Sequence, residues 1–135
     1  MPSLSIPPIL SPSYLLDLFY YMKSTSYENM YEKKDYSISV LIPVRNKEKT
    51  IESCINSILN QTYPIKRVIA INDNSNDRTG EVLNRYKGEI EIIHNKNRKG
   101  KTRSILDSLE MLEEELFIVV DGDTLLKENF VDEIR

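Results

Sequence analysis

The chain has 135 residues, of which 40% are hydrophobic and 29% are charged, and its formal net charge is −3. This length suffices for one compact domain with a hydrophobic core and is too short for two. The negative net charge argues against nucleic acid as a partner. The single cysteine excludes an intrachain disulfide framework and is compatible with a reducing compartment.

Residues 1–36 differ in composition from the remainder and predict an N-terminal arm. Prolines among serines interrupt regular structure near the start, and the apolar residues 14–22 that follow predict one short helix. This run is shorter than the roughly 18 apolar residues of a membrane span, and the N-terminus lacks the basic start of a signal peptide. We therefore expect a cytoplasmic protein whose arm helix packs on the flank of its own domain. Peripheral attachment to a membrane surface is the alternative.

From residue 37 onward, strand and helix patterns alternate. Residues 38–42 predict a strand that Pro43 closes, because proline has no N–H for a central ladder. Residues 47–60 predict a helix, since apolar side chains recur there at spacings of three and four. This apolar stripe contains Ile51, Cys54, Ile55, Ile58 and Leu59. We expect these side chains, including the cysteine, to belong to the hydrophobic core.

The rest of the chain repeats this alternation. In order, the predicted elements are strand, helix, strand, helix, strand and helix at residues 67–71, 79–87, 89–93, 102–114, 116–120 and 128–135. The pattern predicts an α/β fold, with a Rossmann-like, mostly parallel sheet and flanking helices. Because the carboxyl ends of parallel strands lie on one edge of the sheet, loops that are far apart in sequence should converge there.

Residues 116–123 consist of five apolar residues followed by two aspartates, one on each side of a glycine. The apolar run is typical of a strand buried on both faces of a parallel sheet. Asp121 and Asp123 would then lie at its carboxyl end, where they suit Mg²⁺ or Mn²⁺, and Gly122 would leave room for a phosphate. The alternative is structural: Asp121 starts a turn and Asp123 caps the helix that follows.

Charged residues in two other loops add to this predicted site. Asp73 follows the second strand, and a basic segment extends over residues 96–103. Together with a bound cation they suit a nucleoside diphosphate, with lysine near the phosphates and Asp73 near the base or ribose. A solvated turn is the alternative for the basic segment. The single histidine, His94, is expected to be structural or solvent-facing.

Motifs in four regions follow one another in a distinctive order. They read VLIPVRNKE at residues 40–48 with SILNQTYP at 57–64, INDNSNDRT at 71–79, NRKGK at 97–101 and VDGD at 120–123. Together they resemble the family 2 inverting glycosyltransferases of GT-A fold, over about residues 37–135. The resemblance implies that residues 37–135 form a nucleotide-diphospho-sugar-binding domain, the N-terminal half of the family's fold. One departure is Asn72, which stands where the family usually has the first of two acids.

The resemblance also implies roles for individual residues. The residues expected to bind the nucleotide are Pro43, Val44, Arg45, Asn46, Asp73, Lys101 and Asp121. Within this set, Asp73 would face the base and Lys101 would approach the diphosphate. Asp121 and Asp123 would form the DxD pair that holds Mg²⁺ or Mn²⁺.

The implied reaction is transfer of a sugar from a nucleotide-diphosphate sugar to an acceptor saccharide or lipid, in polysaccharide or glycolipid synthesis, with a UDP-sugar favoured as donor. Inverting transfer needs a general base on the face of the sugar opposite the leaving diphosphate. Glu128, Asp132 and Glu133 fall in a predicted helix that leaves the site, so no residue is assigned as this base. The domain is therefore expected to be truncated relative to the family.

Other functions remain open at this point. The domain could be a non-catalytic nucleotide-sugar-binding module, or a truncated remnant that acts with a partner chain or a second copy of itself. An NTPase with a phosphate-binding loop is a further alternative, because Gly100-Lys101-Thr102 precedes a predicted helix. The first glycine of such a loop would fall at position 95, which is Asn95.

Overall fold

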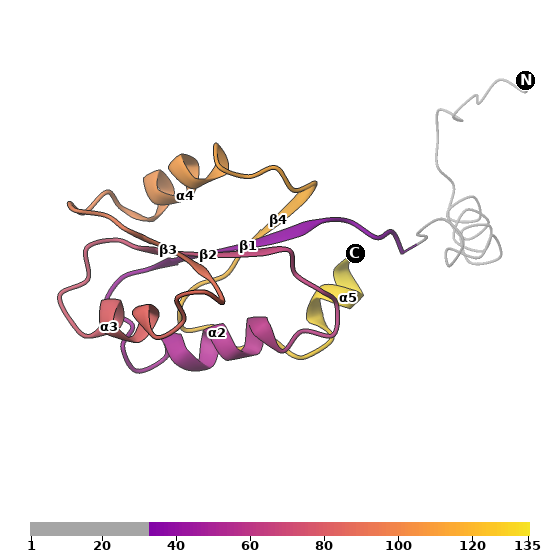
Figure 1. Ribbon diagram of the computed structural model, residues 1–135, viewed down its shortest axis with the longest axis horizontal. Helices are drawn as coiled ribbons and strands as arrows, with labels where there is room; N and C mark the ends of the chain where they lie inside the picture. Colours follow the sequence, from indigo (N-terminus) through magenta and orange to yellow (C-terminus); the bar gives the residue numbers. More distant parts are fainter. Residues whose placement is uncertain (1–32) are drawn as a thin grey trace, which may run out of the picture. The chain divides into compact units, whose positions relative to one another are not determined.

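Strand β1 (Ile38–Val44) lies at the centre of the fold, and all seven of its residues are buried. Its aliphatic, partly β-branched sequence favours an extended backbone that is covered on both faces. The computed structural model describes residues 33–135 (Figure 1). The arm helix predicted at residues 14–22 lies outside the described residues, as does most of the predicted arm.

Four parallel strands form one sheet in the order β3-β2-β1-β4. The three strands beside β1 in this sheet are β2 (Arg67–Asn72), β3 (Glu91–His94) and β4 (Leu116–Val119). Val44 pairs with Asn72, which in turn pairs with His94, so β1, β2 and β3 end side by side. The prediction of an α/β fold with a mostly parallel sheet is confirmed, and the loops that follow the strands share one edge.

In the described part of the chain, four helices flank the sheet, namely α2 (Ile51–Leu59), α3 (Thr79–Asn84), α4 (Lys101–Leu109) and α5 (Phe130–Ile134). Figure 1 shows α2, α3 and α5 on one face and α4 on the other. Successive β1 side chains point to opposite faces, so Val40 and Ile42 pack in the cluster that contains the buried face of α2, whereas Leu41 packs with Ile105 of α4. Within residues 33–135, no helix is long and apolar enough to cross a membrane.

Each helix predicted from residue 37 onward is present, but each is shorter than its apolar pattern indicates. α2 begins at Ile51 instead of residue 47, because the N–H groups of Thr50 and Ile51 both donate to the carbonyl of Lys47 in a preceding turn. After α3, Arg85 and Tyr86 donate to carbonyls three residues earlier. Such tighter turns continue the apolar spacing of a helix without extending the helix itself.

Pro43 lies inside β1 and pairs with Ile71, although the sequence predicts that it ends the strand. The side of β1 that faces β4 is marked by the hydrogen bond from the N–H of Val120 to the carbonyl of Leu41 (2.9 Å). Backbone polar groups of residues two apart point to the same side of a strand, so the backbone nitrogen of Pro43 also faces β4. Pairing with β4, however, ends at Leu41. The prediction was therefore wrong, since the missing N–H of Pro43 falls beyond the paired part of β4.

Leu59 departs from the predicted core stripe of α2. Its side chain is 39% exposed, whereas Ile55 and Ile58 are almost completely buried. Leu59 is the last residue of the helix and lies at the margin of the stripe, next to the C-cap residue Asn60. The prediction that Leu59 belongs to the core was wrong, because spacing alone does not show how far the core extends along the helix.

β4 also differs from its prediction as a strand buried on both faces. It pairs with β1 alone and forms one edge of the described sheet. Leu116 and Phe117 are 41% and 48% exposed, and only Ile118 of this strand packs against the core clusters. An apolar run has the composition of a central strand, but its burial depends on neighbours that the run itself does not specify.

Candidate functional site

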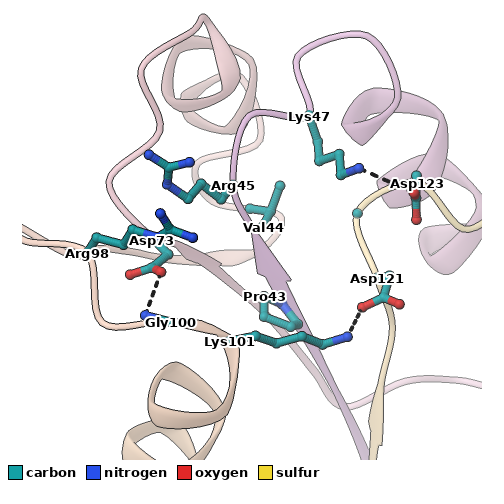
Figure 2. A pocket seen from close by; sticks show the side chains of 11 residues that line it. Pro43, Val44, Arg45, Lys47, Asp73, Arg98, Gly100, Lys101, Asp121 and Asp123 are labelled. Carbon is teal, nitrogen blue, oxygen red and sulfur yellow. Dashed lines mark hydrogen bonds and ion pairs between the residues drawn. The ribbon is translucent and has the colours of Figure 1, made fainter.

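The loops after the four strands converge on a cavity of about 340 Å³ (Figure 2). It is lined by Pro43, Val44, Arg45, Lys47, Asp73, Arg98, Gly100, Lys101, Asp121, Gly122 and Asp123. Every residue predicted to bind nucleotide or metal is in this set except Asn46. The convergence follows from the parallel sheet, because the carboxyl ends of its strands share an edge.

Asn46 joins the loop after β1 to the loop after β2 and does not line the cavity. Its backbone is left-handed, with a φ of 52°, a conformation that asparagine adopts more readily than most residues. Its N–H donates to Ser75 Oγ (3.0 Å), and its Oδ1 accepts from the N–H of Asn76 (2.7 Å). Asn46 thus supports the shape of both loops.

Asp73 is 5% exposed and anchors the basic loop. Its Oδ1 accepts hydrogen bonds from the N–H of Lys99 (2.8 Å) and from Asn95 Nδ2 (3.0 Å). Its Oδ2 accepts from the N–H of Gly100 (2.9 Å), where a φ of 86° makes the turn suited to glycine. Burial alone raises the pKa of Asp73, but these hydrogen bonds and the nearby Arg98 charge hold that pKa below its usual value.

Asp73→Asn is expected to loosen this loop, because its amide replaces a carboxylate acceptor by a donor that opposes a backbone N–H. We expect the free energy of unfolding at neutral pH to fall by about 1–3 kcal/mol and the Lys99 and Gly100 amides to exchange hydrogen faster. The folded-state pKa of Asp73 is lowered, so its stabilisation is present above the unfolded-state pKa and lost as pH falls through the folded-state value. Urea unfolding should therefore show the difference from wild type shrinking on acidification, and a pH-independent difference would contradict this assignment.

Asn72 belongs to a polar network behind the site. Its Oδ1 accepts from the N–H of Ser75 (3.2 Å) and from Ser75 Oγ, so its Nδ2 is the donor toward His94 Nδ1 (3.0 Å). His94 Nε2 then donates to Asn84 Oδ1 (3.1 Å). The predicted structural role of His94 agrees with this arrangement, in which its imidazole links two amide side chains.

Asp121 and Asp123 each face a lysine from another part of the chain (Figure 2). Asp121 Oδ1 accepts a hydrogen bond from Lys101 Nζ, and Asp123 Oδ2 lies 3.3 Å from Lys47 Nζ. Both carboxylates are about half exposed, at 54% and 53% of their side-chain surface. Asp121 also starts a turn, since its carbonyl accepts from the N–H of Thr124 (3.0 Å).

The structural alternative for Asp123 does not hold. The helix after it is α5, which begins at Phe130 with Asn129 at the N-cap position. Asp123 therefore caps no helix, and its carboxylate lines the cavity instead.

Gly122 is required by close packing against β1. A Cβ at this position would lie 2.9 Å from Val44 Cγ2, which is shorter than side chains tolerate. The sequence predicts that this glycine leaves room for a phosphate, whereas the contact that excludes a side chain is with Val44. The loop is further held by Thr50 Oγ1, which donates to the carbonyl of Gly122 (3.1 Å).

Cys54 is fully buried in α2, as predicted for a core residue. Burial raises the pKa of its thiol to about 11, so the thiol stays protonated near neutral pH. Its Sγ donates to the carbonyl of Asp121 (3.4 Å). Cys54 therefore supports the backbone of the acidic loop and is not placed to act as a nucleophile.

The donor set of the cavity fits a hard divalent cation that is bound in part by its substrate. Among the described residues, no group of three or more His, Cys, Asp or Glu side chains could enclose a metal ion. Asp121 and Asp123 supply two carboxylates, and Mg²⁺ or Mn²⁺ commonly binds one or two carboxylates together with substrate phosphates. The site thus suits a metal that arrives with a phosphate ligand.

Two charged residues of the cavity, Lys47 and Arg98, were not among those predicted from the sequence to bind nucleotide or metal. Lys47 was counted as the start of a helix, and Arg98 was part of the basic segment without an individual role. Arg45 was predicted, and its Nε is buried without a hydrogen-bond partner in the described part of the chain. A buried unpaired donor beside a cavity suits a ligand that brings an acceptor.

Comparison with known families decides the classification. Residues 39–134 match the family described as glycosyl transferase family 2. The chain belongs to glycosyl transferase family 2. The sequence resemblance is thereby confirmed, and the cavity lies within the matched residues.

Curated relatives of this family 2 chain come from several bacteria. Glycosyltransferase GlyG of Streptococcus pneumoniae is 29% identical over 98 residues, which cover 70% of this chain and 33% of the relative. Poly-beta-1,6-N-acetyl-D-glucosamine synthase of Staphylococcus epidermidis is 27% identical over 94 residues, which cover 68% of this chain and 23% of the relative. The chain thus spans about one third or less of the length of these relatives.

Solved structures show the same fold. S. aureus TarS 1-349 superposes with a TM-score of 0.66 at 23% identity, covering 73% of this chain and 31% of TarS 1-349. The mannosyltransferase PcManGT of Pyrobaculum calidifontis gives a TM-score of 0.64 at 21% identity, covering 80% of this chain and 35% of that protein. The described domain therefore corresponds to part of a GT-A-type structure.

Proposed function

We propose that this domain binds a nucleotide-diphosphate sugar and presents it for transfer to an acceptor, as the donor-binding half of a family 2 glycosyltransferase. The observation that carries the proposal is the cavity in which two adjacent carboxylates lie among basic side chains. An arrangement of this kind complements a metal-bound diphosphate. Residues 37–135 would constitute the donor-binding domain.

The charges around the cavity support a diphosphate ligand. Four cationic side chains line it, from Arg45, Lys47, Arg98 and Lys101. Three carboxylates oppose them, from Asp73, Asp121 and Asp123, so the lining has one net positive charge by formal count. A divalent cation on the two DxD carboxylates would raise this charge further and strengthen attraction for the phosphates.

Within this proposal, Asp121 and Asp123 hold Mg²⁺ or Mn²⁺. When bound, such a cation stabilises the negative charge that develops on the leaving diphosphate. The structural neighbours support the choice of metal, because the structure of PcManGT is a complex with GDP-Man and Mn²⁺. Lys101 contributes a further positive charge on the phosphate side, next to Asp121.

The nucleoside would occupy the part of the cavity formed by β1 and the loop after β2. Pro43, Val44 and Arg45 line this part, and the unpaired Nε of Arg45 is a donor available to the ligand. Asp73 shapes the wall through its bonds to the basic loop. A UDP-sugar is favoured as donor, and TarS, which shares the fold, was crystallised with UDP and with UDP-GlcNAc.

The residues that bind the acceptor and the residue that acts as general base would lie outside the described residues. None of Glu128, Asp132 and Glu133 lines the cavity. The three carboxylates that do line it are those engaged with the basic loop or with lysines. This observation favours a second candidate function, a nucleotide-sugar-binding module that depends on a partner chain for transfer.

Calorimetric titration of the full chain with UDP, GDP and ATP, each with and without Mn²⁺, tests the proposal. We expect UDP to bind most tightly and to require Mn²⁺. Tight binding of ATP alone would instead favour the phosphate-binding-loop NTPase. Absence of binding to any nucleotide, by a chain that circular dichroism shows to be folded, would contradict the proposed function.

A further inference from the structure

Lys47 is held in a defined place beside the acidic loop, although no role has been assigned to it. Its N–H donates to Thr79 Oγ1 (2.8 Å), which joins it to the start of α3. Its carbonyl accepts from the N–H of Thr50 (3.1 Å) and Ile51 (2.9 Å), which joins it to the start of α2. The backbone from which this side chain extends is therefore fixed on two sides.

The side chain of Lys47 runs along Gly122 and ends at Asp123. A Cβ on Gly122 would lie 3.4 Å from Lys47 Cγ, so the aliphatic stem passes close to the backbone between the two DxD carboxylates. Lys47 Nζ then lies 3.3 Å from Asp123 Oδ2, and Figure 2 shows this pair beside the Lys101–Asp121 pair. The ammonium of Lys47 is thus positioned beside the acidic loop.

This ion pair is well suited to exchange. The side chains of Lys47 and Asp123 are 42% and 53% exposed, and exposed pairs contribute little to stability. A cation shared by Asp121 and Asp123 would compete with the Lys47 ammonium for Asp123 and repel it as a like charge. The flexible lysine stem lets the ammonium move while its backbone stays in place.

We propose that Lys47 is a binding residue of the donor site that changes partner, pairing with Asp123 in the metal-free protein and with the diphosphate when metal and nucleotide are bound. This inference rests on the proposed function, since it uses the metal site at Asp121 and Asp123. Lys47 comes from the loop after β1, whereas Lys101 comes from the start of α4. The diphosphate is then contacted by ammonium groups from two sides of the cavity.

Partner exchange predicts effects of opposite sign for metal and nucleotide. Lys47→Met removes the group that competes with the cation, so affinity for Mn²⁺ alone should rise by about two- to fivefold. The same variant lacks a charge-assisted hydrogen bond to the phosphates, so affinity for UDP at saturating Mn²⁺ should fall by about tenfold or more. A purely structural role for Lys47 would lower both affinities or change neither.

The test uses the full chain and two probes, Mn²⁺ alone followed by electron paramagnetic resonance and UDP at saturating Mn²⁺ followed by calorimetry. Lys47→Arg keeps the charge and should retain most of the UDP affinity. Lys66→Met is the matched control. It removes an exposed lysine that precedes β2, at the amino-terminal end of the strands and away from the cavity. Circular dichroism checks that each variant is folded.

The possible outcomes separate the exchange from the proposed function. Opposite shifts in Lys47→Met, with neither shift in Lys66→Met, support the exchange. Normal binding of Mn²⁺ and UDP by the wild type, with unchanged or equally weakened binding in Lys47→Met, overturns the exchange alone. Failure of the wild type to bind Mn²⁺ or UDP overturns the metal site and the exchange together.

Discussion

Asp121→Asn combined with Asp123→Asn is expected to abolish the Mn²⁺ dependence of UDP binding. The two carboxylates are the anionic groups at the cavity mouth, and a neutral amide is a far weaker ligand for a hard divalent cation. Both side chains are about half exposed, and within residues 33–135 their ion-pair partners are two partly exposed lysines, so the free energy of unfolding should change by less than about 1 kcal/mol. Calorimetry with and without Mn²⁺, together with urea unfolding, measures the two effects separately.

A matched control removes two carboxylates elsewhere on the chain. Glu113→Gln with Glu115→Gln neutralises two exposed residues that precede β4. They lie at the amino-terminal end of the strands, whereas the cavity lies at the carboxyl end. This variant should bind UDP and Mn²⁺ as the wild type does, despite the same change in net charge. Equal metal-dependent affinity in the Asp121/Asp123 variant and the wild type would rule out the proposed metal site.

Ile55→Ala and Leu59→Ala are expected to differ widely in stability, although both residues lie on the apolar side of α2. Ile55 is fully buried within the main core cluster, so its truncation should cost about 2–5 kcal/mol through lost burial and the cavity left behind. Leu59 is 39% exposed at the helix end, and its truncation should cost less than about 1 kcal/mol. Urea unfolding of the two variants, compared at equal m-values, measures the difference.

Neither substitution touches the cavity, so UDP affinity under native conditions should be unchanged in both. Similar losses of stability in Ile55→Ala and Leu59→Ala would show that the core extends to the end of α2. The pair therefore tests where the hydrophobic core stops, a property on which sequence and structure disagree for this helix.

Local patterns in the sequence were sufficient for most of the fold. Runs rich in β-branched residues mark the strands, and three- and four-residue spacing marks the helices. Their boundaries were less accurate, because apolar spacing continues through the tight turns at Arg85 and Tyr86 after the helix has ended. Pro43 was misjudged for a related reason, since its effect depends on how far the neighbouring strand β4 extends.

For the candidate site too, one part was predictable from the sequence and another part depended on the tertiary structure. The meeting of its loops could be predicted, because every contributing loop follows a strand of one parallel sheet. The individual roles could not, since Asn46 supports a loop instead of lining the cavity and Lys47 was counted as part of a helix. A lysine in a loop has no local signal that distinguishes a site residue from a solvated one.

The sequence by itself determined the alternation of strands and helices, and with it the edge at which Asp73, Lys101 and the DxD pair meet. Only the tertiary structure decided which groups these carboxylates contact. Lys47 and Asp123 are 76 residues apart in the chain, and Asp73 is 27 residues from Gly100. Such pairings depend on how distant loops pack, whereas the parallel direction of the strands follows from the alternation of strands and helices along the chain. The exposed edge at β4 has the same origin, because burial is set by neighbours and not by the composition of the strand.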